Sequence, residues 1–223
     1  MNPVQPHFLK AGIVCYDVGA GRAVRTLPLL VNPATLRRSF EIKESAVSTY
    51  STGALRLTAP AVEKIDVEVK LDATDAILRS LDGASLSGAA GAAAAEGVRP
   101  WVAALQMLIN PTSAAIQANA ALRQSGTLEI VPMEQPLTLF VWGAGNILPV
   151  KLTSISVSED LFDPRLVPVT ATVTLGLRVL SVADLGVTSR GGALFMAYLR
   201  GIERRAALLP DGNPAELGIA GAL

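Results

Sequence analysis

The most regular pattern in the chain is an alternation of apolar and charged residues over positions 64–71. Its apolar face holds Ile65, Val67, Val69 and Leu71, and its charged face holds Lys64, Asp66, Glu68 and Lys70. A period of two with β-branched residues predicts a half-buried strand. The charged face is either a plain solvated surface or the lining of a pore or a contact between subunits.

A longer alternation covers residues 168–180. Its apolar face holds Val169, Ala171, Val173, Leu175, Leu177 and Val179, and its other face holds Thr170, Thr172, Thr174, Gly176 and Arg178. At ~3.3 Å per residue this strand runs roughly 40 Å, which is long for an ordinary sheet.

Shorter patterns predict further strands, over 12–18, 23–31, around Phe40 and Ile42, and over 127–131, 137–142 and 150–157. The glycines between the first two strands favour a hairpin, because glycine readily adopts a positive φ. Within 150–157 the apolar parity changes at Thr153-Ser154, which predicts a β-bulge.

Helical spacing appears in three places. Residues 100–109 start with Pro100 in the first turn and end at Asn110-Pro111. The alanine-rich residues 113–124 are expected to form a second helix or a continuation of the first after a break. Between them and the preceding strand, the Gly/Ala/Ser segment 82–97 predicts a flexible loop, although its alanines also allow a helix.

The third helix follows Gly191-Gly192 and carries an apolar stripe. The stripe comprises Leu194, Phe195, Tyr198, Leu199 and Ile202, with arginines mostly opposite. This helix either packs on its own sheet or docks onto a neighbouring subunit. The docking reading predicts that deletion of 190–223 impairs assembly and leaves the domain folded.

Composition narrows the function classes. Half of the 223 residues are apolar, 17% are charged, and 19 basic residues balance 19 acidic ones. High apolar content and zero net charge exclude a chain that is disordered throughout, and no basic footprint for nucleic acid is visible. Burial between subunits is one explanation for the apolar surplus, which the small residues of 82–97 also inflate.

The N-terminal sequence lacks an apolar segment followed by a small-residue cleavage site, so no signal peptide is expected. The uncharged run between Arg99 and Arg123 is long enough to raise the question of a membrane span, but polar residues interrupt it. We therefore expect a cytoplasmic protein with no membrane anchor.

Candidate catalytic chemistry is sparse. A single histidine, His7, and a single cysteine, Cys15, do not suffice for a tetrahedral zinc site without carboxylates. A histidine-dependent triad would have to use His7, and its sequence surroundings do not suggest one. No phosphate-binding glycine motif occurs, so neither an enzyme nor a cofactor is expected. The open alternative is a carboxylate-based hydrolase using Asp66, Asp72 or Asp163. Trp101 and Trp142 lie in apolar stretches and are expected to pack in the core.

Four segments together resemble the tube-domain proteins of contractile injection systems, which are phage-tail-like particles. Residues 31–36 (VNPATL) resemble the family's "FNPxxL" entry, 140–143 (FVWG) its "F-x-W-G" segment, 150–157 the strand that follows, and 161–171 (LFDPRLVPVTA) its "LFDxxGxPVRAxV" motif. The residues that carry the match are Asn32, Pro33, Leu36, Phe140, Trp142, Gly143, Leu161, Phe162, Asp163 and Pro168. The resemblance covers roughly residues 25–183.

The resemblance implies a non-enzymatic structural part of the particle, a ring at the junction of the baseplate hub and the inner tube. It implies a mainly β fold with flanking helices: an antiparallel β-barrel or sandwich of the tail-tube type, with a central helix and a C-terminal amphipathic helix. The implied partners are further copies of the chain in a hexameric ring, the spike or hub protein and the inner-tube protein. The protein would be cytoplasmic during assembly and then part of the particle.

On this basis residues 1–183 form the tube-like domain and 184–223 a C-terminal helical extension. The lumen or an interface would be lined by Thr170, Thr172, Thr174 and Arg178, or by the charged face Lys64, Asp66, Glu68 and Lys70. The chain departs from the family in three ways: it has no LysM-like module, Leu166 or Val167 stands where the motif has glycine, and Thr170 stands where it has arginine. The alternative is a β-sandwich module that binds carbohydrate or cell wall.

Overall fold

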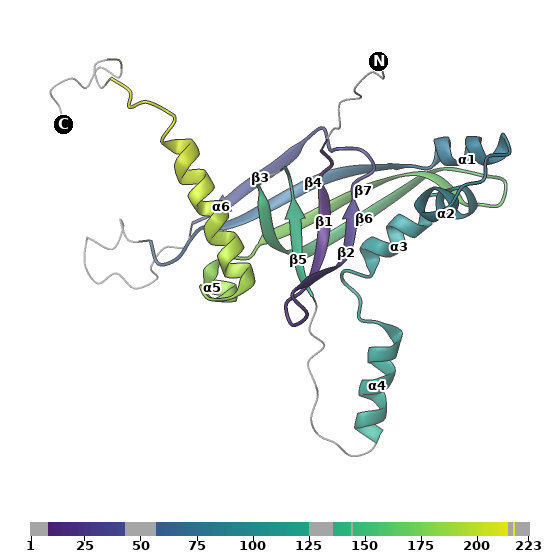
Figure 1. Ribbon diagram of the computed structural model, residues 1–223, viewed down its shortest axis with the longest axis horizontal. Coiled ribbons are helices and arrows are strands. Elements are labelled where there is room, and N and C mark those ends of the chain that lie inside the picture. Colours follow the sequence, from purple (N-terminus) through teal and green to yellow (C-terminus); the bar gives the residue numbers. More distant parts are fainter. Residues whose placement is uncertain (1–8, 43–56, 125–135, 144, 214–215, 217–223) are drawn as a thin grey trace.

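The computed structural model describes residues 9–42, 57–124, 136–143, 145–213 and 216. Its strands form one antiparallel sheet in the order β2-β1-β5-β6-β7-β4-β3. Figure 1 shows the strands together with the helices. The strands are β1 (Gly12–Asp17), β2 (Arg22–Pro28), β3 (Leu36–Glu41), β4 (Val62–Asp72), β5 (Leu137–Val141), β6 (Ile147–Phe162) and β7 (Pro168–Val179).

Six helices accompany the described strands. They are α1 (Thr74–Leu81), α2 (Gly88–Glu96), α3 (Arg99–Gln106), α4 (Ser113–Gln124), α5 (Val182–Leu185) and α6 (Arg190–Ala206). Helices α1 to α3 gather at one end of the long strands β4, β6 and β7, and α6 lies toward the other end (Figure 1). Helix α4 points away from the sheet, and none of its residues is buried.

One apolar core joins the sheet to α2, α3 and α6. It contains the odd-numbered apolar residues of β4 and β7, Ile13 and Cys15 of β1, Phe140 of β5, and residues of α2, α3 and α6. Because β4 and β7 pair in register, with Val67 opposite Leu175 and Val69 opposite Val173, the alternations of the two strands put their apolar residues on the same face.

Several sequence predictions are confirmed. The strands near 12–18 and 23–31 form the expected hairpin, and β6 has its register shift between Leu152 and Ser154, where the parity change predicted a bulge. The helices expected over 100–109 and 113–124 correspond to α3 and α4. The predicted strand at 127–131 and His7 lie outside the described residues.

The predicted fold class, mainly β with antiparallel strands and flanking helices, is confirmed. The predicted closure of these strands into a barrel or sandwich is not. The described strands form a single open sheet whose end strands, β2 and β3, are not paired with each other. Closing a barrel requires the first and last strands to pair. Here β3 covers only Val62–Val67 of β4, and most of β2 is exposed.

Two local predictions need correction. The expected flexible insert at 82–97 is helical over Gly88–Glu96, the option that its alanines allowed. Helix α2 is held where the chain turns into α3, since the Val98 N–H donates to the carbonyl of Pro168 at 3.0 Å. Helix α1 was not expected from the sequence at all.

The docking reading of the C-terminal helix is wrong for its apolar stripe. Phe195 and Tyr198 are 6% and 4% exposed and belong to the core, and Leu199 and Ile202 pack against that core. Leu194 is half-buried. The stripe is therefore covered by the chain's own core, and α6 packs onto the β domain.

Candidate functional site

A polar face runs across β4, β7 and β6, on the side of the sheet opposite the core. Cross-strand pairing places its residues in rows: Glu68–Thr174–Ser156, Lys70–Thr172–Ser158 and Asp72–Thr170–Asp160. Neighbouring strands lie ~4.8 Å apart, so each row brings three polar side chains close together. The residues predicted to line a lumen therefore share one face of the sheet.

The charges on this polar face are largely balanced. At the end nearer α6, Lys64 pairs with Glu41 at 3.0 Å and Arg178 with Asp184 at 2.6 Å. Burial by itself would raise the pKa of Asp184, but hydrogen bonds from the Ser181 backbone and from Arg178 outweigh it and hold that pKa below its usual value.

Long parts of β6 and β4 have a strand on one side only. Strand β5 pairs with β6 only over Ile147–Val150, so 151–162 has β7 on one side and no described strand on the other. On β4, residues 68–72 pair with β7 but extend beyond the reach of β3. Such edges carry unpaired N–H and C=O groups and readily pair with another chain.

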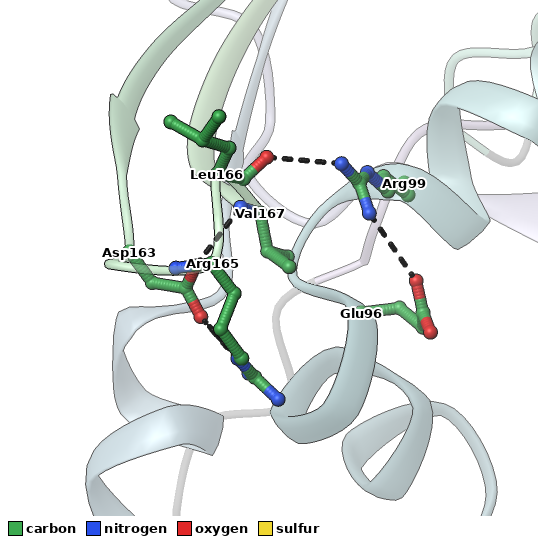
Figure 2. A network of polar contacts seen from close by, with 6 residues as sticks. All are labelled: Glu96, Arg99, Asp163, Arg165, Leu166 and Val167. Atoms are coloured by element: carbon green, nitrogen blue, oxygen red, sulfur yellow. Dashed lines mark hydrogen bonds and ion pairs between the residues drawn. The ribbon is translucent and has the colours of Figure 1, made fainter.

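The turn between β6 and β7 is organised by Asp163 (Figure 2). Its carboxylate accepts hydrogen bonds from the N–H groups of Arg165 and Val167 at 2.8 and 2.9 Å and from Nε of Arg165 at 2.9 Å. The Val167 N–H makes the largest contribution in lowering the pKa of Asp163, with the contacts from Arg165 adding to it. Arg99, which also pairs with Glu96, donates to the carbonyl of Leu166.

Two leucines, Leu161 near the end of β6 and Leu166 in the turn itself, adopt a backbone conformation that favours glycine. The φ angles of Leu161 and Leu166 are 52° and 60°. A left-handed conformation costs roughly 1–2 kcal/mol for a residue with a Cβ. Leu166, rather than Val167, therefore stands in the conformational position that suits the glycine of the resembled motif.

Two other motif segments, 31–36 and 140–143, meet at the C-terminal end of β5. Asn32, Pro33, Trp142 and Gly143 line one small hollow, although they are about 110 positions apart in the chain. The Asn32 side chain accepts from the Ala11 N–H at 2.9 Å and donates to the Leu9 carbonyl at 2.8 Å. Gly143 has a φ of 86° in the β5–β6 turn. These residues thus fix the entry to β1 and the turn after β5. Leu36, at the start of β3, is half-buried and packs against the core.

A buried polar cluster, not expected from the sequence, ties α6 to the sheet. Glu63 of β4 is only 5% exposed; its carboxylate accepts from Arg38 Nε at 2.6 Å and from the Tyr198 hydroxyl at 3.0 Å, and Arg38 also contacts that hydroxyl. Burial first, and then the Glu63 carboxylate, raise the pKa of Tyr198 to about 12. The sequence could have predicted the burial of Glu63, since this residue lies two positions before Ile65 and therefore on the same, core-facing side of β4.

Two of the three candidate carboxylates, Asp66 and Asp72, lie too far apart to form a catalytic pair. Asp66 and Asp72 are six residues apart on β4, about 20 Å. Glycoside hydrolases hold their carboxylates within about 5–9.5 Å. Asp72 accepts from the Thr74 N–H at the start of α1, and Asp163 is engaged in its turn. No group of metal-binding side chains occurs among the described residues.

Comparison with known proteins adds no family. No protein-family model matches the chain, and no curated protein matches it. The resemblance to tube-domain proteins thus rests on the motif residues alone. In the described part of the chain, no helix is both long and apolar enough to cross a membrane.

Proposed function

We propose that the protein is a structural subunit of a contractile injection particle, forming a ring at the junction of the baseplate hub and the inner tube. In this assembly the polar face lines the passage. Its hydroxyls and balanced charges present a hydrated wall to which cargo does not adhere. The partners would be other copies of the chain, the hub and the inner-tube protein.

The observation that carries the proposal is the polar face with its uncovered edge. A long unpaired edge promotes aggregation of a monomeric domain, and such domains usually have edge strands that are short, carry charged side chains or are covered by another element. Here residues 151–162 of β6 pair with β7 only. The neighbouring strands β7 and β4 carry hydroxyl and charged side chains on the polar face. A ring in which neighbouring sheets continue one another would cover this edge and close by rotation.

The turn geometry gives independent support. The resembled motif has glycine where Leu166 stands, and the backbone at Leu166 is left-handed. The acidic residue of the same motif, Asp163, organises that turn through its carboxylate. The conformation of the turn at 163–167 is thus compatible with the acidic residue and the glycine of the resembled motif.

The test is imaging of the purified full chain by negative-stain electron microscopy, with its mass measured by analytical ultracentrifugation. Six-fold rings or stacks of rings are expected. The double variant Ser156→Lys/Ser158→Lys places added positive charge beside the uncovered edge and, in a ring, repeats it in every subunit. We expect this variant to lose rings and to remain folded, because both serines are exposed.

A matched control is Ala193→Lys/Ala197→Lys, which adds the same charge to the exposed side of α6. This variant should assemble like the parent chain. Parent protein that stays monomeric at all concentrations would contradict the proposal, as would rings that form equally well with the two edge lysines.

A further inference from the structure

The tip of the β6–β7 hairpin exposes apolar side chains at a conformational cost. Leu161, Phe162 and Leu166, here called the apolar tip, are 63%, 49% and 72% exposed. Two of the three have a positive φ, where glycine or asparagine is the usual choice. Neither burial among the described residues nor local geometry accounts for leucine at positions 161 and 166, and a contact with another molecule would account for it.

Acidic residues flank the apolar tip. Glu159 and Asp160 precede it on β6, and Asp72 lies in the same cross-strand row as Asp160, with Thr170 between them. All three carboxylates are exposed. The arginines nearby are engaged, since Arg165 pairs with Asp163 and Arg99 with Glu96. A partner that covers the tip would therefore be apolar with basic residues around it.

The same chain carries a groove of that description. Two hollows of about 300 and 520 Å³ adjoin, since both are lined by Leu108, Pro136 and Thr138. The charged residues that line these hollows within the described part of the chain are Arg25, Lys151 and Arg190, all of them basic. Most of the remaining lining is apolar, and no residue of the apolar tip belongs to it.

We propose that the apolar tip of one copy inserts into this basic groove on a second copy, with Glu159 and Asp160 facing Lys151 and Arg190. Tip and groove are different surfaces, so one copy can use both at once. The contact is head-to-tail, and such contacts close into rings when the rotation allows. This inference rests on the proposed function and names a second contact between neighbouring copies, in addition to the β6 edge.

Opposite charges across an interface fix the orientation of the partners, and like charges placed there are strongly unfavourable. The test therefore uses two charge reversals in the full chain: Glu159→Arg/Asp160→Arg on the tip and Lys151→Glu/Arg190→Glu in the groove. Self-association is measured by sedimentation velocity over a range of concentrations. Each reversal alone should weaken association by about tenfold or more.

Two combinations make the test specific. A chain carrying all four substitutions should associate like the parent, because tip and groove have exchanged signs. An equal mixture of the two reversed chains should associate although neither does alone. The control Arg200→Glu/Glu203→Arg alters exposed charges of α6 away from the groove and should leave association unchanged.

A second variant separates the tip from overall folding. Leu166→Gly relieves the left-handed backbone and should raise the melting temperature while lowering self-association, two effects of opposite sign. Damage to the fold would lower both. Association that is unaffected by Leu166→Gly and by the charge reversals would overturn the inference.

The outcomes distinguish this inference from the proposed function. Rings that persist through both charge reversals would overturn the tip-in-groove contact and leave the ring in place. Association that follows the charge rules but yields open chains without rings would support the contact and count against the ring. A parent chain that never self-associates would overturn both.

Discussion

At the scale of single residues, the position of a residue in the alternation of a strand can decide its burial even against its residue type. Glu63 is charged, but it occupies a core-face position of β4 and is buried with Arg38 and Tyr198. A buried carboxylate is tolerated only when its oxygens are hydrogen-bonded and its charge is paired. Both conditions are met here, and the cluster joins β3, β4 and α6, which are distant in the sequence.

The Tyr198 hydroxyl makes the stability of this cluster dependent on pH. Its pKa of about 12 is above the ordinary value of 10.0, so it stabilises the folded protein fully below about pH 10 and loses that effect as pH rises toward 12. We predict that Tyr198→Phe loses about 1.5–3 kcal/mol of unfolding free energy at pH 8, the contribution of a hydrogen bond to a charged group.

The measurement is urea unfolding of the parent and Tyr198→Phe chains at pH values from 8 to 12. The difference in unfolding free energy between them should shrink above pH 10. A difference that stays constant through pH 12 would show that the Tyr198 hydroxyl does not couple to Glu63 as described.

At the scale of elements, the helices at the far end of the long strands are seated by one close approach of two backbones. Gly97 has a φ of 59°, and a Cβ there would collide with the carbonyl oxygen of Pro168. The next residue, Val98, donates its N–H to that same oxygen. Glycine at position 97 thus allows the link between α2 and α3 to lie directly against the start of β7.

We predict that Gly97→Ala destabilises the protein by roughly 1–3 kcal/mol more than Gly88→Ala. Gly88 is the matched control, because its φ is 60° but nothing lies within 4 Å of a Cβ built there. The comparison therefore isolates the collision from the backbone preference, and thermal unfolding followed by circular dichroism measures it. Equal losses in the two variants would mean that α2 and α3 are not seated in this way.

At the scale of the whole molecule, α6 is part of the core and the apolar surplus is largely used within the chain. The large exposed apolar residues nonetheless include Leu161 and Leu166 at the hairpin tip and Leu78 and Leu81 on α1. Internal packing thus leaves part of the surplus at the end of the long strands, where the proposed assembly contact lies.

We predict that truncation after Thr188 prevents folding, contrary to the expectation that the domain survives without its C-terminal extension. Removing Phe195 and Tyr198 deletes two buried aromatic side chains, each worth roughly 3–5 kcal/mol. Their sum approaches the 5–15 kcal/mol stability typical of a whole domain. Far-ultraviolet circular dichroism and solubility of the truncated chain provide the measurement.

Truncation after Ala207 is the control, because the described residues beyond it are exposed. That shorter deletion should melt at nearly the parent temperature. A folded, soluble chain ending at Thr188 would mean that α6 is dispensable for the core.

The sequence by itself determined which faces of β4 and β7 are buried, where β6 carries its bulge, and where α3, α4 and α6 lie, because these follow from the spacing of nearby residues. It did not determine the burial of β2 and β3, where Val24 and Phe40 are exposed. Nor did it determine whether the sheet closes, that Gly88–Glu96 is helical, that Glu63 is buried with Arg38 and Tyr198, or that the stripe of α6 is covered by the chain's own core. Each of these depends on contacts between segments distant in the chain, whose free energy no local pattern contains. Only the tertiary structure shows that β7 pairs with one side of β6 while residues 151–162 of β6 have no described strand on the other side. This unpaired edge is the physical basis of the proposed ring.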